Sequence, residues 1–292
     1  RGSSSGHSSK GGASTAQSGV AGGTPGKSRY GSPRRARGNV GVSSPAPKAS
    51  HGRKLSLNLP NRELSGSSAL AQAAATAAHG LRGFNDWDAL LADPAVDAVI
   101  IATPPAPRFD LARRALEAGK HLLLEKPIAL HADQARELQR LALARGLSVA
   151  VDYEYRAVPL FMQAARLLQA GAVGTPWLVK LDWLMGSRAD PQRGWNWYAQ
   201  ADQGGGVIGA LGTHAMDMLA WLIGPLGAVQ ALNSVSIKQR PHPDGGLATV
   251  DAADVSLIQT VAHWKGRREL LVPAQVSLSS VSRNGRGFCL DV

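Results

Sequence analysis

Residues 99–129 read VIIATPPAPRFDLARRALEAGKHLLLEKPIA, and this stretch decides the fold class. An apolar, β-branched run over residues 96–102 ends at Thr103-Pro104-Pro105, and a second apolar run over residues 121–124 ends at Glu125-Lys126-Pro127. Between them, residues 110–118 have a helical period that a glycine ends. Strand, helix and strand in about 30 residues indicate a parallel βαβ unit. Because ligands bind at the carboxyl ends of parallel strands, both strand ends are candidate ligand-binding positions.

The segments on either side extend this unit. Helices are expected over residues 68–79, 86–92 and 132–145, and a further strand over residues 148–151. Beyond it we expect a helix over 159–170, a strand over 176–183, a Trp-rich loop over 188–203, a helix over 206–222, and strands near 229–238, 255–261 and 275–282. Consecutive strands without helices between them indicate an open sheet. The predicted fold class is α/β, with an incomplete Rossmann-like parallel domain followed by an α+β domain with an open, largely antiparallel sheet.

Charge and composition divide the chain in two. Residues 1–60 contain 10 Lys and Arg, no Asp or Glu, and 25 Gly and Ser, whereas residues 61–292 contain 22 basic and 21 acidic residues. The first part has too little apolar surface to offset the entropy of ordering, so we predict that residues 1–60 form a disordered, basic Gly/Ser-rich segment. The second part is long enough for one large domain or two smaller ones.

Several kinds of site and location are excluded by residue usage. The single cysteine, Cys289, excludes an intramolecular disulfide and a cysteine-cluster metal site. Asp152 and Glu154 are two near-adjacent carboxylates without an evident third ligand, so no metal site is predicted. No long uncharged apolar run predicts a membrane span. Arg34-Arg35 lacks the apolar segment of an export signal, so we expect a cytoplasmic protein.

Residues from Ala69 to Ser282 resemble the Gfo/Idh/MocA family of NAD(P)-dependent oxidoreductases, which act on sugars, cyclitols and related polyols. The matching motifs have the family's spacing and comprise Thr103-Pro104, Gly119-Lys120-His121, Glu125-Lys126-Pro127, Gly204-Gly205-Gly206 and the sequence GTHAMD over 212–217. The resemblance implies a partial dinucleotide-binding domain over 61–155 and a shortened substrate or oligomerisation domain over 156–292. It also implies NAD or NADP as the cofactor, a polyol or sugar substrate, and a homo-oligomer formed through the second-domain sheet.

The resemblance assigns the two catalytic residues. Lys126 matches a lysine that lies beside the nicotinamide and hydrogen-bonds the substrate hydroxyl, and Pro127 is expected to follow a cis peptide. His214 is the candidate base. Asp217 lies three residues further on, so we expect it to share a helix face with His214 and to orient the imidazole. Ala210 stands where many members carry Asp, which predicts a weaker proton relay, a different substrate orientation or a subgroup that never used the acid.

Cofactor contacts are implied at two strand ends and where the second domain begins, namely by Thr103, Pro104, Glu125, Lys126, Pro127 and Arg156. Tyr155, next to Arg156, lies near where the family contacts cofactor or substrate. Trp195 and Trp197 are candidates for stacking on a sugar ring, and packing of the loop explains them equally well. Arg108 stands where the family often has His, and we assign it no role.

The front of the dinucleotide-binding domain is missing from the pattern. No strand followed by G-x-G-x-x-G, the unit that binds the pyrophosphate, can be found. One hypothesis is that residues 1–60 come from a wrong reading frame or gene boundary, and we favour it. The other is that a genuine basic arm replaced the first βαβ unit. The family's second domain usually runs longer, so we expect the chain to be incomplete at both ends.

Three functions compete. The first is hydride transfer between NAD(P) and the secondary alcohol of a sugar, cyclitol or similar polyol. The second is a non-catalytic family member that acts as a binding or oligomerisation module. The third is salt-sensitive nucleic-acid binding by the basic arm, which ranks last because Tyr30 is its only aromatic residue. Cofactor binding discriminates the first function from the second.

Overall fold

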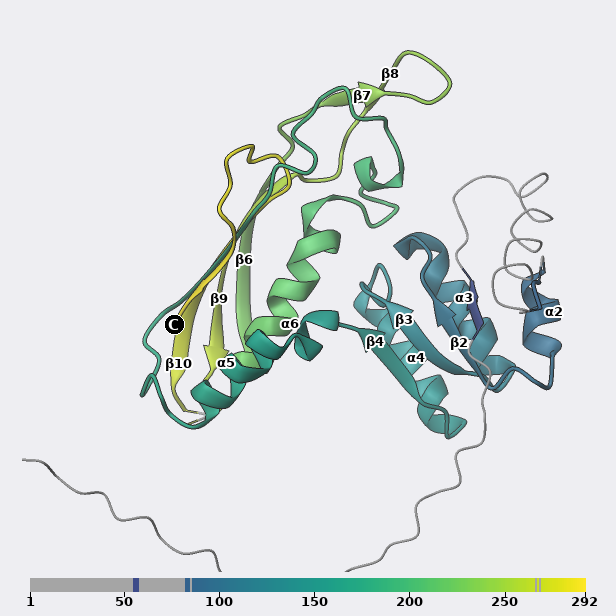
Figure 1. The fold of residues 1–292 in the computed structure, drawn as a ribbon, viewed down its shortest axis with the longest axis horizontal. Coiled ribbons are helices and arrows are strands. Elements are labelled where there is room, and N and C mark those ends of the chain that lie inside the picture. Colours follow the sequence, from purple (N-terminus) through teal and green to yellow (C-terminus); the bar gives the residue numbers. More distant parts are fainter. Residues whose placement is uncertain (1–54, 58–81, 85, 266, 268) are drawn as a thin grey trace, which may run out of the picture. The chain divides into compact units, whose positions relative to one another are not determined.

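The computed structural model of the chain describes residues 55–57, 82–84, 86–265, 267 and 269–292 (Figure 1). The helix expected over 68–79 lies outside these residues, as does nearly all of the segment 1–60. The described residues belong to one compact unit. None of its described helices is long and apolar enough to cross a membrane.

The first sheet has four parallel strands in the order β1-β2-β3-β4, which are Leu55–Leu57, Ala98–Ile101, His121–Glu125 and Val149–Asp152. Helices α2, α3 and α4 span Trp87–Ala92, Pro105–Glu117 and Ala132–Ala144. The βαβ unit read from residues 99–129 is thus β2-α3-β3, and the predicted parallel arrangement is confirmed. Strand order follows chain order among the described strands, so the reversal of order at which dinucleotides bind is not found among them.

Several boundaries differ from the sequence prediction, and the start of α3 is one of them. Helix α3 begins at Pro105 rather than at residue 110, because proline is tolerated in the first helical turn, where its missing N–H is not needed. Gly119 follows the helix with φ of 77°, as expected for a helix-ending glycine. Strand β1 lies inside residues 1–60, so the prediction that this whole segment is disordered is wrong for residues 55–57.

The core of the first domain lies between this sheet and its helices. Leu122 and Leu124 of β3 alternate with less buried neighbours, as in a strand that packs its faces unequally. Leu138 of α4 and Leu116 of α3 are fully buried. The cluster as a whole comprises Leu90, Leu91, Val96, Val99, Ile101, Ala112, Ala115, Leu116, Leu122, Leu124, Leu138 and Ala142.

The second sheet has the strand order β11-β5-β10-β9-β6. Its strands are Gly287–Asp291, Val179–Leu184, Leu271–Ser279, Val255–His263 and Leu226–Ser234 in that order. Only β5 and β10 pair in parallel, which confirms the largely antiparallel sheet that was predicted. The sequence analysis missed β11, and it also missed the small hairpin of β7 (Gln239–Pro241) and β8 (Leu247–Thr249).

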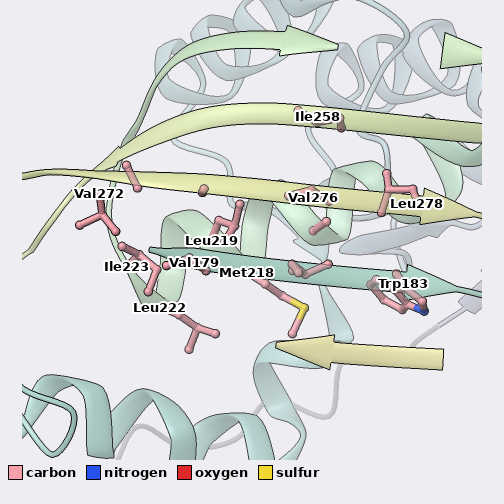
Figure 2. Packing of buried hydrophobic residues seen from close by; sticks show 14 of the residues in the cluster. Val179, Trp183, Met218, Leu219, Leu222, Ile223, Ile258, Val272, Val276 and Leu278 are labelled. Carbon is pink, nitrogen blue, oxygen red and sulfur yellow. The ribbon is translucent and has the colours of Figure 1, made fainter. Parts of the chain in front are cut away.

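Helices α5 (Pro159–Gln169) and α6 (Thr213–Leu222) accompany this sheet. Strands β9 and β10 bury every second residue, and α6 is apolar on the side that faces them. Figure 2 shows side chains of α6 lying against those of the strands, and the labelled set is Val179, Trp183, Met218, Leu219, Leu222, Ile223, Ile258, Val272, Val276 and Leu278. This core fixes α6, which carries the candidate base.

Three short helical segments complete the second domain. They are η1 (Glu154–Ala157), η2 (Trp197–Ala199) and the π-helical segment η3 (Ile208–Gly212). Residues 206–222 are helical throughout, as expected, but residues 208–212 have π-helical rather than α-helical geometry before α6. Such π-helical insertions are rare and occur frequently at functional sites.

Candidate functional site

The carboxyl ends of β2, β3 and β4 bring the predicted site residues to one edge of the first sheet. Ile101 pairs in register with Leu124, and Glu125 pairs with Asp152. Thr103 follows β2 and Lys126 follows β3. The structure therefore brings the turns of the two quoted motifs together, as the βαβ interpretation requires.

Lys126 reaches from this edge to the second domain. Its peptide bond to Pro127 is cis, as the resemblance implied. The Nζ atom donates a hydrogen bond to the carbonyl oxygen of Ala210 in η3, at 2.8 Å. Burial lowers the pKa of Lys126 below its ordinary value, while the charges of Glu125 and Glu154 oppose the shift. The ammonium thus lies in a partly desolvated position where interaction with a ligand is strengthened.

His214 is buried in the first turn of α6 among aromatic rings. Its ring centroid lies 4.8 Å from that of Tyr155, 5.8 Å from that of Tyr153 and 6.0 Å from that of Trp183. Burial, assisted by the charge of Lys126, lowers the pKa of His214 to about 4. The imidazole is therefore neutral at neutral pH and can accept a proton.

A carboxylate lies beside this imidazole, but it is not the expected one. Glu154 Oε1 is 3.7 Å from His214 Nε2. Asp217 instead accepts two hydrogen bonds from Arg156, from Nε at 2.8 Å and from Nη2 at 2.6 Å. The hydrogen bond raises the pKa of Arg156. The predicted orienting role of Asp217 is wrong in this respect, because a bidentate ion pair already occupies its carboxylate.

Arg156 is thus engaged by the second domain from which it comes. Its guanidinium also lies 5.8 Å from the ring centroid of Trp221. The side chain remains about half exposed, at 48%. Cofactor contact by Arg156 stays a prediction.

Sequence reasoning missed Arg108. This arginine in the first turns of α3 is buried, and it donates hydrogen bonds to the carbonyl oxygens of Thr103 and Pro127. Burial lowers the pKa of Arg108 to about 10, against the charge of Glu125. A signal was present in the sequence, because residue 108 lies on the same helix face as the buried residues Ala112 and Ala115. An arginine on the apolar face of a helix requires polar partners.

The other predicted cofactor contacts lie around this arginine. Thr103 is 4% exposed, and its Oγ1 has no hydrogen-bond partner among the described residues. Pro104 precedes the first turn of α3 as its N-cap residue. The Glu125 carboxylate accepts a hydrogen bond from the backbone N–H of Lys126 at 3.1 Å. These positions lie at the expected strand ends, and their contact with a cofactor stays a prediction.

A cavity of about 610 Å³ adjoins the cis-proline turn. Pro127 and Leu130 line it from the first domain, while Gly204, Asp202 and Asp251 line it from the second. Gly204 has φ of 76°, and a Cβ atom there would lie 2.6 Å from Leu130 and 2.7 Å from Pro105. The glycine signature thus permits close approach of the second domain to the ligand-bearing edge.

The loop tryptophans have partners within the second domain. Trp195 Nε1 donates to the carbonyl of Thr249 at 2.9 Å, and its ring lies 5.1 Å from that of His242. The ring of Trp197 lies 5.9 Å from that of Tyr198. Packing of the loop therefore accounts for both residues. Among the described residues no group of three His, Cys, Asp or Glu is placed to hold a metal ion.

Two family models match the chain. Residues 46–153 match the oxidoreductase family with an NAD-binding Rossmann fold named GFO_IDH_MocA, and residues 161–272 match the GFO/IDH/MocA C-terminal domain. The first match begins at residue 46, so the start of the resemblance at Ala69 was placed too late.

Curated relatives share these regions. The uncharacterized oxidoreductase sll0816 of Synechocystis sp. is 44% identical over 212 residues, which cover 72% of this chain and 55% of the relative. Levoglucosan dehydrogenase of Pseudarthrobacter phenanthrenivorans is 32% identical over 163 residues, which cover 56% of this chain and 42% of that enzyme. The chain thus spans about half the length of these relatives.

Solved structures resemble the fold at 25% sequence identity. Levoglucosan dehydrogenase in complex with NADH and L-sorbose superimposes with a TM-score of 0.70 over 77% of this chain and 60% of that one. An NAD-binding oxidoreductase from Klebsiella pneumoniae gives a TM-score of 0.68 over 77% of this chain and 59% of that one.

Proposed function

Because this chain belongs to the GFO/IDH/MocA family of oxidoreductases, we propose that it transfers a hydride between NAD(P) and the secondary alcohol of a sugar or similar polyol. The observation that carries the proposal is the hydrogen bond from Lys126 Nζ to the carbonyl oxygen of Ala210, at 2.8 Å, because Ala210 lies four residues before His214. The charge of Lys126 also contributes to the lowered pKa of His214. A cation and a neutral imidazole therefore lie together at the ligand-binding edge of a parallel sheet.

Oxidation of a secondary alcohol requires a proton acceptor and a positive group that stabilises the developing alkoxide. A bound nicotinamide cofactor supplies the hydride acceptor. Lys126 donates a hydrogen bond to the reacting hydroxyl oxygen and stabilises its negative charge. His214, neutral before reaction, accepts the hydroxyl proton, and the Glu154 carboxylate at 3.7 Å then stabilises the imidazolium.

The residues at the strand ends fit the nicotinamide end of the cofactor. The buried hydroxyl of Thr103 lacks a partner among the described residues, and it lies at the end of β2 beside the Lys126 turn. We propose that Thr103, Pro104, Glu125, Lys126 and Pro127 contact the cofactor there, with Arg156 at the start of the second domain.

The substrate class is proposed from the cavity and from the relatives. The cavity has both polar and apolar lining residues, a combination that suits the hydroxyl-rich and apolar faces of a sugar. Its polar side chains are those of His131, Asp202, Thr213, Asn233, Ser234 and Asp251. Levoglucosan dehydrogenase, which resembles this chain, has been solved with NADH and L-sorbose. A small cyclic or open-chain sugar is therefore the first substrate class to test.

Titration of the purified chain with NADH and with NADPH tests the proposal. The seven tryptophans provide an energy-transfer signal for the bound nicotinamide. We expect saturable binding in the micromolar range, followed by reduction of NAD or NADP with a member of a sugar and polyol panel. Lys126→Ala lowers turnover by about 100-fold or more in this scheme, whereas Arg136→Gln, a change to a surface arginine of α4, leaves turnover unchanged. Absence of cofactor binding up to millimolar concentration overturns the proposal.

One observation favours a second candidate, a family member that binds its ligand without chemistry. Ala210 replaces the acid that many members carry four residues before the histidine, and its backbone carbonyl accepts the Lys126 hydrogen bond. Cofactor binding without turnover of any panel member supports this candidate.

A further inference from the structure

Arg108 connects the two strand ends that carry the proposed site. One Nη atom donates to the carbonyl of Thr103 after β2, and the other donates to the carbonyl of Pro127 after β3. The arginine itself lies in α3, the helix that joins these two strands. A single guanidinium thus links all three parts of the βαβ unit at its ligand-binding edge.

The bridge requires a guanidinium. Its planar fork presents donors in a fixed geometry, so it can satisfy two carbonyls on separate turns at once. A lysine ammonium is a compact charge on a flexible stem and does not reproduce that geometry. The link is therefore specific to the residue type as well as to its charge.

The bridge is also costly. Arg108 is 2% exposed, its Nε has no hydrogen-bond partner, and no carboxylate accepts a hydrogen bond from it among the described residues. A buried charge that makes no hydrogen bond to a carboxylate is unfavourable for folding, and the nearby charge of Glu125 offsets only part of this cost. A buried residue that is unfavourable for folding and lies beside a ligand-binding edge is typical of a functional constraint.

We propose that Arg108 is a positioning residue, which holds the cis-proline turn against the end of β2 and thereby places the Lys126 ammonium at Ala210 and at the bound substrate. The proposal rests on the role given to Lys126 under the proposed function. Arg108 acts through Pro127, the neighbour of Lys126, and it needs no contact with the reacting atoms.

The test measures the reactivity of Lys126 in the chain without cofactor or substrate. Competitive acetylation with acetic anhydride over a range of pH, read by mass spectrometry of the Lys126 peptide, gives the midpoint pH at which the amine becomes reactive. Arg108→Met removes the bridge and the charge, while Arg108→Lys keeps the charge and removes the fork. Arg113→Met, on the same helix but in a surface pair with Glu117, is the matched control.

Lys120 reports folding within the same experiment. Its Nζ is held by the carbonyls of Asp93 and Val96, and the residue is 9% exposed. Its resistance to acetylation shows that the first domain of a variant is intact. A variant that only unfolds therefore exposes Lys120 together with Lys126.

We expect both Arg108 variants to raise the midpoint of Lys126 by about 0.5 pH units or more, because the ammonium leaves its desolvated position at Ala210. Lys120 stays protected and Arg113→Met has the midpoint of the unchanged chain. A normal midpoint in Arg108→Lys overturns the proposal, because charge alone then explains any effect of Arg108→Met. Exposure of Lys120 in both variants also overturns it, in favour of a general packing role.

The proposed function can fail separately from this inference. Failure of cofactor binding leaves the acetylation midpoints unchanged, since they are measured on the free chain. If the chain is active, Arg108→Lys lowers kcat at least about tenfold and changes KM less, as expected for a misplaced group that acts in the transition state.

Discussion

Strand β3 carries a lysine at each end, and the two lysines have different surroundings. Lys120 precedes the strand, and its Nζ donates to the carbonyls of Val96 at 2.7 Å and Asp93 at 3.1 Å. Lys126 follows the strand, and its Nζ donates to the carbonyl of Ala210 alone among the interactions described, at 2.8 Å. Both lysines are bound by backbone carbonyls, and burial lowers the pKa of Lys126.

The difference shows that β3 carries a structural lysine at one end and a candidate catalytic lysine at the other. The buried Lys120 ammonium donates hydrogen bonds to carbonyls of the loop between α2 and β2. Lys126 has three donor hydrogens, and one described acceptor leaves donor capacity for a ligand. The ammonium that keeps donors for a ligand, that of Lys126, thus lies at the carboxyl end of the strand. Ligands generally bind at this end of parallel strands.

The largest effect is expected from Lys126→Met. Loss of the positive group lowers turnover by about 100-fold to 1,000-fold, the range seen when a group that stabilises an oxyanion is removed. The free energy of unfolding measured with urea changes little, because the Ala210 carbonyl can bind water once the lysine is removed. Steady-state rates with the sugar found in the panel measure the effect. Turnover equal to that of the unchanged chain would remove Lys126 from the mechanism.

Lys120→Met tests the other end of the strand. Two buried carbonyls lose their donor, so we expect the free energy of unfolding to fall by about 1–3 kcal/mol. Urea denaturation at neutral pH measures this fall, and NADH affinity stays the same. If the variant lost cofactor binding while it kept its stability, the distinction between the two ends of β3 would be wrong.

The pH dependence of stability tests His214, the other proposed catalytic residue. The folded chain holds this imidazole neutral down to a pKa of about 4, whereas the ordinary value is 6.5. As the pH falls from 6.5 towards 4, the unfolded chain binds a proton that the folded chain does not, so stability is lost over this window. Stability from this group is fully present above pH 6.5.

The corresponding variant is His214→Gln, which cannot titrate. We expect it to reduce the fall in Tm between pH 7 and pH 5 by about 2 °C or more. Thermal unfolding at the two pH values measures the change, and His131→Gln at an exposed position serves as the control. Equal falls in Tm for the variant and the unchanged chain would contradict the neutral, buried imidazole.

The smallest effect is expected from Ala210→Asp, which adds an acid next to the Lys126 acceptor. A nearby carboxylate favours the charged amine, so acetylation of Lys126 at a fixed pH slows by about threefold or more. Ala210→Asn adds a similar volume without charge and leaves the rate unchanged. A faster reaction in Ala210→Asp would show that the new side chain displaces the ammonium instead of pairing with it.

Much of the fold was predictable because its signals are local. The residues 121–125 and 159–169 form the strand and helix expected there, with boundaries shifted by a residue at most. Hydrophobic period, proline and glycine positions report the conformation of neighbouring residues. Strand β11 and the β7–β8 hairpin were missed because they are short and bury no apolar residue, since Arg240 is their single buried side chain.

The sequence predicted which residues lie at the site, but it did not predict which partners their side chains bind. The motif containing Lys126 and Pro127 correctly indicated the strand end and the cis peptide. The interpretation of Asp217 failed because helix spacing shows which side chains share a face, and it does not show that Arg156, 61 positions away, binds the carboxylate first. Arg108 was passed over because its two acceptors are backbone carbonyls, which no sequence pattern displays.

By itself, the sequence determined that a parallel βαβ unit ends in Glu125-Lys126-Pro127, because periodicity and turn residues act over a few positions. It also determined the family, through motifs at matching spacing. Only the tertiary structure decided which partner each charged side chain binds. The contact between Lys126 and Ala210 spans 84 positions, and burial, which lowers the pKa values of Lys126 and His214, exists only after the chain has folded.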